Sequence, residues 1–122
     1  MEMDEKTIEK IVRMTVAELK AVDMLSEPGK SDYQKTEDLL RNYNYFIASR
    51  NPDLLEIIKK VDYALEAISS DPYYSVIIMY YMSGETRESI ARTFDTSERT
   101  ISRQKGRLVN LLSEIIFPKR TG

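Results

Sequence analysis

The sequence predicts an all-α protein of about six helices. Apolar residues recur at steps of three and four through most of the 122 residues, which is the spacing of one face of an α-helix. Two pairs, Asn51-Pro52 and Asp71-Pro72, have the form of a helix N-cap followed by a proline in the first turn. Gly84 suits the left-handed residue that ends a helix. These signals divide the chain into its predicted helices.

Residues 1–30 are predicted to form an N-terminal helix and a linker. The helix covers residues 3–25, and its apolar stripe consists of Ile8, Ile11, Val12, Val16, Leu19 and Val22. Pro28 and Gly29 both interrupt a helix, so the segment SEPGKS at residues 26–31 is the predicted linker.

Residues 31–122 are predicted to form one helical domain. Its first helix begins near Ser31 or Asp32 and ends near Arg50. The apolar stripe of that helix consists of Tyr33, Thr36, Leu40, Tyr43 and Ile47, with Leu39 and Phe46 beside it. The next helix follows Pro52, and its apolar residues are Leu54, Ile57, Ile58, Val61, Leu65 and Ile68.

The segment Tyr73 to Met82 is apolar on nearly every side, which is typical of a short helix at the centre of a core. A strand is the alternative for its VIIMYYM stretch, because β-branched and aromatic residues favour strands. The Asp-Pro pair before it and Gly84 after it favour the helix.

A helix-turn-helix is predicted at residues 86–110. A first helix capped by Thr86 extends to Phe94, and a three-residue break, Asp95 to Ser97, follows it. Ser97 caps the second helix, whose apolar side consists of Ile101, Leu108, Leu112 and Ile115. Two such helices must approach closely at the turn. The residues expected at this contact are the small Ala91 and a wedge of Ile90, Phe94 and Ile101.

The opposite face of the second helix follows from a rotation of about 100° per residue. It is predicted to carry Arg99, Arg103, Gly106 and Asn110, with Ser102 at its edge. Arginine can donate two hydrogen bonds to the O6 and N7 atoms of guanine, so Arg99 and Arg103 are the main candidates for base contacts. The predicted phosphate contacts are Arg92, Ser97, Lys105 and Arg107. A plainly solvated basic face is the alternative, and the cap, the break and the alanine together favour the DNA-binding motif.

The charge of the chain is unevenly distributed. The formal net charge is −2, but residues 1–82 carry −5 and residues 83–122 carry +3. A basic C-terminal third is expected if only this part meets phosphate groups.

Composition argues against an enzyme. The chain has no cysteine and no histidine, which removes disulfides, most zinc sites and the commonest general base. The acidic residues are scattered along the predicted helices, so we expect no metal and no cofactor. The missing cysteine fits a cytoplasmic protein. No apolar run approaches the ~18 residues of a membrane span, and the first residues lack the pattern of a signal peptide.

The segment TRESIARTFDTSERTIS resembles region 4 of bacterial RNA polymerase sigma factors. The residues that match that pattern in kind are Thr86, Glu88, Ile90, Phe94, Asp95, Ser97 and Ile101. The resemblance implies that the positions approaching major-groove bases are those of Glu98, Arg99, Ser102 and Arg103. Thr96 stands where valine or leucine is usual, and Ser102-Arg103 replaces the Arg-Gln pair common in primary sigma factors. The base preference of those proteins therefore does not carry over.

A longer stretch, from Tyr33 to Phe117, resembles the ArpU-like late-operon regulators of phages and prophages. The segments that carry this resemblance are YQKTEDLLRNYNYF, DPYYSVIIMYYMSGETRESIA and SRQKGRLVNLL. It implies a transcriptional activator of phage genes in a bacterial host, with a sigma-like DNA-binding end. Residues 1–30 lie outside the resemblance.

The expected function is therefore sequence-specific binding of duplex DNA in transcription regulation. The alternative is a sigma-like interaction module that binds RNA polymerase or another regulator and binds DNA weakly alone, which the acidic residues 1–82 would suit. Three roles stay open for the helix at 3–25: packing on the same core, forming a homodimer, or docking on polymerase.

Overall fold

The computed structural model describes residues 29–118, and this part of the chain is helical without any strand. Its α-helices are α3 Asp32–Ser49, α4 Leu55–Ala67, α5 Tyr74–Ile77, α6 Arg87–Thr93 and α7 Glu98–Ile116. A 3₁₀ turn, η1 (Pro52–Leu54), precedes α4, and a π-helical turn, η2 (Ile78–Met82), continues α5. The all-α prediction is confirmed for the described part. The predicted helix at 3–25, and with it the count of about six, lies outside the described residues.

Side-chain caps fix where the helices begin. The Ser31 hydroxyl accepts a hydrogen bond from the Gln34 backbone N–H, and the Gln34 side chain accepts one from the Ser31 N–H. The Asn51 side chain accepts from the N–H of Asp53, which places Pro52 in the first turn as predicted. The Asp71 carboxylate likewise accepts from the N–H of Tyr73.

The predicted helix at 73–82 is present as α5 and η2, so the strand alternative is wrong for this segment. The N–H of Ser83 donates to the carbonyl of Ile78 at 3.0 Å, five residues back, which is the hydrogen bond of a π-turn. Gly84 then adopts a left-handed conformation with φ of 68°, as expected for the residue that ends this helix.

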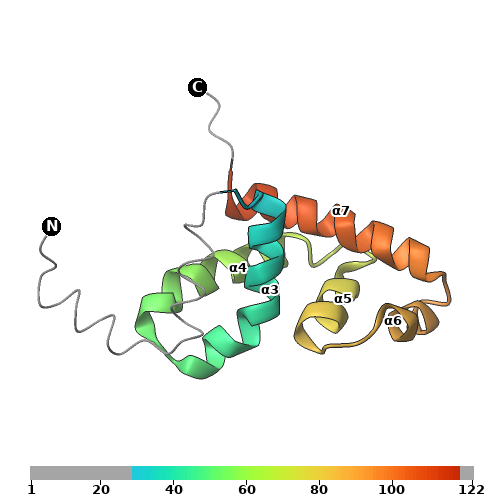
Figure 1. The fold of residues 1–122 in the computed structure, drawn as a ribbon, viewed down its shortest axis with the longest axis horizontal. Helices are drawn as coiled ribbons and strands as arrows, with labels where there is room; N and C mark the ends of the chain where they lie inside the picture. The colour runs from blue at the N-terminus through green and yellow to red at the C-terminus, as the bar shows by residue number, and fades with distance from the viewer. Residues whose placement is uncertain (1–28, 119–122) are drawn as a thin grey trace, which may run out of the picture.

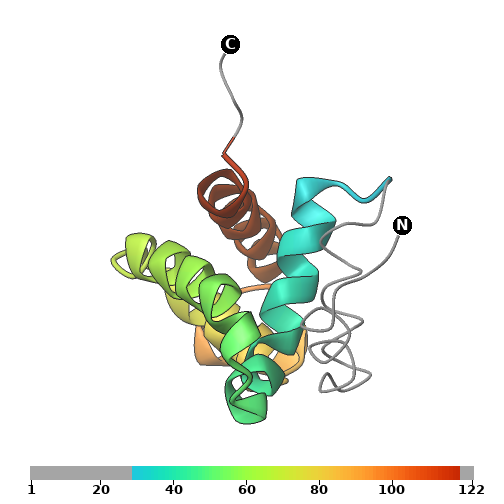
Figure 2. The same ribbon diagram turned by 90° about the vertical axis from the view of Figure 1, so that its left-hand side faces the viewer.

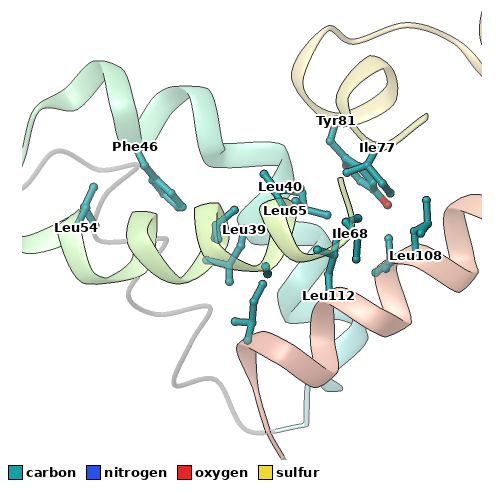
Figure 3. Close-up of a cluster of buried hydrophobic side chains, with 14 residues drawn as sticks. Leu39, Leu40, Phe46, Leu54, Leu65, Ile68, Ile77, Tyr81, Leu108 and Leu112 are labelled. Carbon is teal, nitrogen blue, oxygen red and sulfur yellow. The ribbon is translucent and has the colours of Figure 1, made fainter. Parts of the chain in front are cut away.

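The main core lies between α3, α4, α5, η2 and α7 (Figure 3). It includes Leu40, Leu65, Ile77, Leu108 and Leu112, each with at most a few per cent of its surface exposed. One sequence-based expectation for this core is wrong. Ile47 was expected on the apolar stripe of α3 but is 47% exposed, and Phe46 is buried instead. Figure 3 shows Phe46 beside Leu54 of η1, because the last turn of α3 faces the connection to α4.

Helix α7 is the element that holds the fold together. It packs against α3, α4, α5 and α6 (Figure 1). Seen from the end, α3, α4 and α7 surround a common centre (Figure 2). The beginning of α7 lies next to α6, and its end lies next to the start of α3 (Figure 1). Within residues 29–118, no helix has the length and apolar character that crossing a membrane requires.

Candidate nucleic-acid interface

Helices α6 and α7 both begin with a side-chain cap. The Thr86 hydroxyl accepts a hydrogen bond from the backbone N–H of Ser89 at 3.1 Å. The Ser97 hydroxyl accepts one from the N–H of Thr100, also at 3.1 Å. Each cap satisfies a backbone donor that has no partner within its own helix, so both helices have sharply defined starts.

The turn between the two helices has a fixed geometry. Asp95 is left-handed, with φ of 52°. Its N–H donates to the carbonyl of Arg92, and the N–H of Thr96 donates to the carbonyl of Ala91 at 3.0 Å. This pair of bonds is the Schellman motif, which usually has glycine in the left-handed position. Aspartate tolerates that conformation better than most residues, so the chain reverses here without glycine.

The contact between α6 and α7 is a small buried cluster. It consists of Val76, Ile90, Ala91 and Ile101, of which Ala91 is the most exposed at 5%. Phe94 is half-buried and stacks on Tyr73 with a ring separation of 5.7 Å. The sequence predicts Ile90, Ala91, Phe94 and Ile101 at this contact, and the structure adds Val76 from α5, which no local pattern indicates. The cluster therefore ties both helices to the rest of the fold.

Arg99 and Arg103 lie on the side of α7 that faces away from the core. Both side chains are exposed, and within residues 29–118 neither guanidinium makes a hydrogen bond or an ion pair. Glu98 and Asn110 are exposed as well, whereas Ser102 is half-buried. The structure thus brings the predicted base-contacting residues together along the first two turns of one helix.

The predicted phosphate-contacting residues fall into two groups. Arg92 and Ser97 are exposed. Arg92 has one loose partner, Glu88, at 3.8 Å, and both side chains are more than 70% exposed. A surface pair of this kind contributes little to stability. The Arg92 guanidinium is therefore available for another partner.

Lys105 belongs to the second group, because its side chain is turned into the protein and is only 15% exposed. Its ammonium lies 4.4 Å from the centre of the Tyr80 ring and 3.9 Å from the Glu37 carboxylate. The same carboxylate accepts a hydrogen bond of 2.7 Å from the Tyr81 hydroxyl. Burial, and secondly this hydrogen bond, raise the pKa of Tyr81. Lys105 thus joins α7 to α3 and η2.

Arg107 is also engaged within the protein. Two of its guanidinium nitrogens donate to the two carboxylate oxygens of Asp71, each at 2.9 Å, and its Nε donates to Gln104. The hydrogen bonds that Asp71 accepts from Arg107, followed by the one from the Tyr73 backbone, lower the pKa of Asp71. The pair fixes α7 against the turn that precedes α5.

Gly106, predicted on the outward face, instead lies beside α3. A side-chain carbon at this position would stand 3.8 Å from the hydroxyl oxygen of Tyr33, an ordinary contact distance. The outward face of α7 therefore carries Arg99, Arg103 and Asn110, as predicted, but not Gly106.

One residue near this surface was missed by sequence analysis. Arg87, the first residue of α6, is exposed, and its Nη1 donates to the Ser102 hydroxyl on α7 at 3.0 Å. No helical spacing connects the two positions, since they lie on different helices.

Groups of three or more potential metal ligands are absent from the described residues. No protein-family model matches the chain, and neither the curated proteins nor the solved structures contain a significant match to it. The two capped helices and their exposed arginines are therefore the features on which a functional assignment rests.

Proposed function

We propose that the chain is a sequence-specific duplex-DNA-binding transcriptional regulator in which α6, the turn and α7 form a helix-turn-helix. The observation that carries this proposal is the pair of exposed guanidinium groups of Arg99 and Arg103, which have no partner among residues 29–118, at the capped start of α7. In this motif the second helix lies in the major groove and its N-terminal residues contact base edges. Arginine is well suited to that role, because it can donate two hydrogen bonds to one guanine.

The accessible polar side chains have two proposed roles, contact with bases and contact with phosphates. Arg99 and Arg103 contact bases, assisted by Glu98 and Ser102. Arg92 and Ser97, exposed on α6 and at the start of α7, contact phosphates.

Lys105 and Arg107 receive a different role from the one predicted by sequence. Both are engaged with acidic groups of other elements, Glu37 and Asp71 respectively. Lys105 is largely buried, so a phosphate contact would require it to leave Glu37, and the charge of Arg107 is already neutralised by its two hydrogen bonds to Asp71. We therefore assign both residues to holding α7 in place.

The charge distribution supports a complex in which α6 and α7 face the DNA. Residues 83–122 carry +3 and residues 1–82 carry −5, so the negatively charged DNA attracts the end of the chain that contains α6 and α7. The resemblances to sigma region 4 and to the ArpU-like regulators extend the proposal to activation of phage or prophage genes.

Selection of bound duplexes from a random DNA pool tests the proposal, at a salt concentration of about 150 mM. The proposal expects an enriched motif. A palindromic motif would indicate that two copies bind together, and a single asymmetric site would indicate one copy. No enrichment by a folded protein, as judged by circular dichroism, would contradict sequence-specific binding.

An interaction module for RNA polymerase or another regulator is the second candidate. It is favoured by the exposed apolar side chains Tyr45, Ile47 and Leu55, each about half exposed, at the end of α3 and the start of α4. These segments lie at the end of the molecule opposite α6 (Figure 1). Calorimetric titration with purified RNA polymerase separates the two candidates. Tight binding that Leu55→Ser abolishes, in a chain that enriches no DNA motif, would favour the module.

A further inference from the structure

Arg87 crosses from one helix of the motif to the other. It is the first residue of α6, and its guanidinium donates a hydrogen bond of 3.0 Å to the hydroxyl of Ser102 on α7. Both residues are accessible, Arg87 as an exposed side chain and Ser102 as a half-buried one. The bond therefore lies at the surface, where a ligand can reach it.

The chemistry of the pair leaves several donors available. A guanidinium has five N–H groups, and the bond to Ser102 uses one of them. The serine hydroxyl accepts this bond through a lone pair and keeps its own O–H to donate. The pair thus offers donors from both of its side chains, with their relative placement fixed by the bond between them.

The pair adjoins the proposed base-contacting residues. Ser102 directly precedes Arg103 along α7, which separates the two side chains by about 100° around the helix. Arg99 lies three residues before Ser102, on a neighbouring part of the same surface. The bond from Ser102 therefore draws the guanidinium of Arg87 from α6 to the border of this surface.

We propose that Arg87 is a specificity-determining residue, positioned by Ser102, and that the two side chains together discriminate one base pair beside those contacted by Arg99 and Arg103. This inference rests on the proposed function. It adds a donor from α6 to a surface that otherwise consists of residues of α7.

The test is selection from a random DNA pool with the unmodified chain, Arg87→Ala, Arg87→Lys and Ser102→Ala, followed by affinity measurements on the selected duplexes. The ratio of affinities for the preferred base pair and for another base pair at one position of the motif is expected to fall by about 5- to 150-fold in Arg87→Ala. Ser102→Ala is expected to relax the same position, because the guanidinium loses its anchor. Arg87→Lys keeps the charge but lacks the planar group, so it is expected to recover affinity without recovering discrimination.

Arg92→Ala is the matched control, since it removes another exposed arginine from the same helix. It is expected to weaken binding to all sequences alike and to leave the motif unchanged. A motif that keeps the same base preference at every position in Arg87→Ala, or a loss of affinity shared equally by all sequences, would overturn this inference and leave the proposed function standing. No motif for the unmodified chain would overturn both. Circular dichroism of each variant identifies any loss that comes from unfolding.

Discussion

Replacing Lys105 with methionine is expected to lower the free energy of unfolding by about 1–2 kcal/mol. The value comes mainly from the cation–π contact with Tyr80, at 4.4 Å on a side chain that is 15% exposed. The ion pair with Glu37 adds little, because the cost of desolvation offsets most of the attraction across 3.9 Å. Glu37 also keeps two partners, the Tyr81 hydroxyl at 2.7 Å and the Arg41 guanidinium at 3.2 Å, so the substitution leaves no buried charge unpaired.

Urea unfolding and DNA affinity at several salt concentrations test this prediction together. Lys105→Met is expected to unfold at lower urea and to keep the salt dependence of the unmodified chain. Arg92→Met is the matched control, with unchanged stability and a slope of log affinity against log salt that is less steep by about 0.9. A slope reduced by about 0.9 in Lys105→Met at full stability would show that Lys105 contacts a phosphate.

Other substitutions test the contacts that place α7. Ile101→Ala is expected to lower the free energy of unfolding by about 2–5 kcal/mol, because Ile101 is fully buried where α6 meets α7; an equal loss from Leu111→Ala, at a position 38% exposed, would contradict this. Asp95→Gly is expected to raise stability by about 0.5–1 kcal/mol in thermal melts, since φ of 52° strains any side chain; a lower melting temperature would refute it. Arg107 lowers the folded-state pKa of Asp71, so this pair stabilises fully above the ordinary aspartate pKa of about 3.9 and is lost as pH falls through the lower folded value. The free energy of unfolding, measured across this acidic range, should fall more steeply in the unmodified chain than in Asp71→Asn. The same acid dependence in both chains would argue against a stabilising pair.

Lys105 shows why part of the site could not be predicted from sequence. The apolar residues predicted for α7 step from Ile101 to Leu108, seven residues further along the chain. Position 105 lies within that step, four residues after the first and three before the second, on the buried side of the helix. A lysine suggests exposure by residue type, yet its long stem lets the ammonium reach Glu37 and Tyr80. Helical spacing indicates the buried side for position 105, but it does not reveal the partners Glu37 and Tyr80, which are distant in sequence.

Local signals predicted the elements well, because caps and turns depend on neighbouring residues. The caps at Thr86 and Ser97 form as expected from sequence, and of the two candidates Ser31 and Asp32 it is Ser31 that caps α3. The pairs that orient α7 join residues far apart in the chain, 15 positions for Arg87–Ser102 and 36 for Arg107–Asp71. No periodicity reports such contacts, so they emerge only once the helices are packed.

The proposed function requires that the outward face of α7 contacts bases, and a single comparison of affinities tests this requirement directly. The affinity of Arg103→Ala is measured by fluorescence anisotropy for the selected duplex and for a scrambled duplex, with the exposed Lys60→Ala on α4 as a charge-matched control. The ratio of the two affinities is expected to fall by about 5- to 150-fold in Arg103→Ala and to stay unchanged in Lys60→Ala. Equal losses on both duplexes in Arg103→Ala, or no loss on either, would contradict direct base contact by this face.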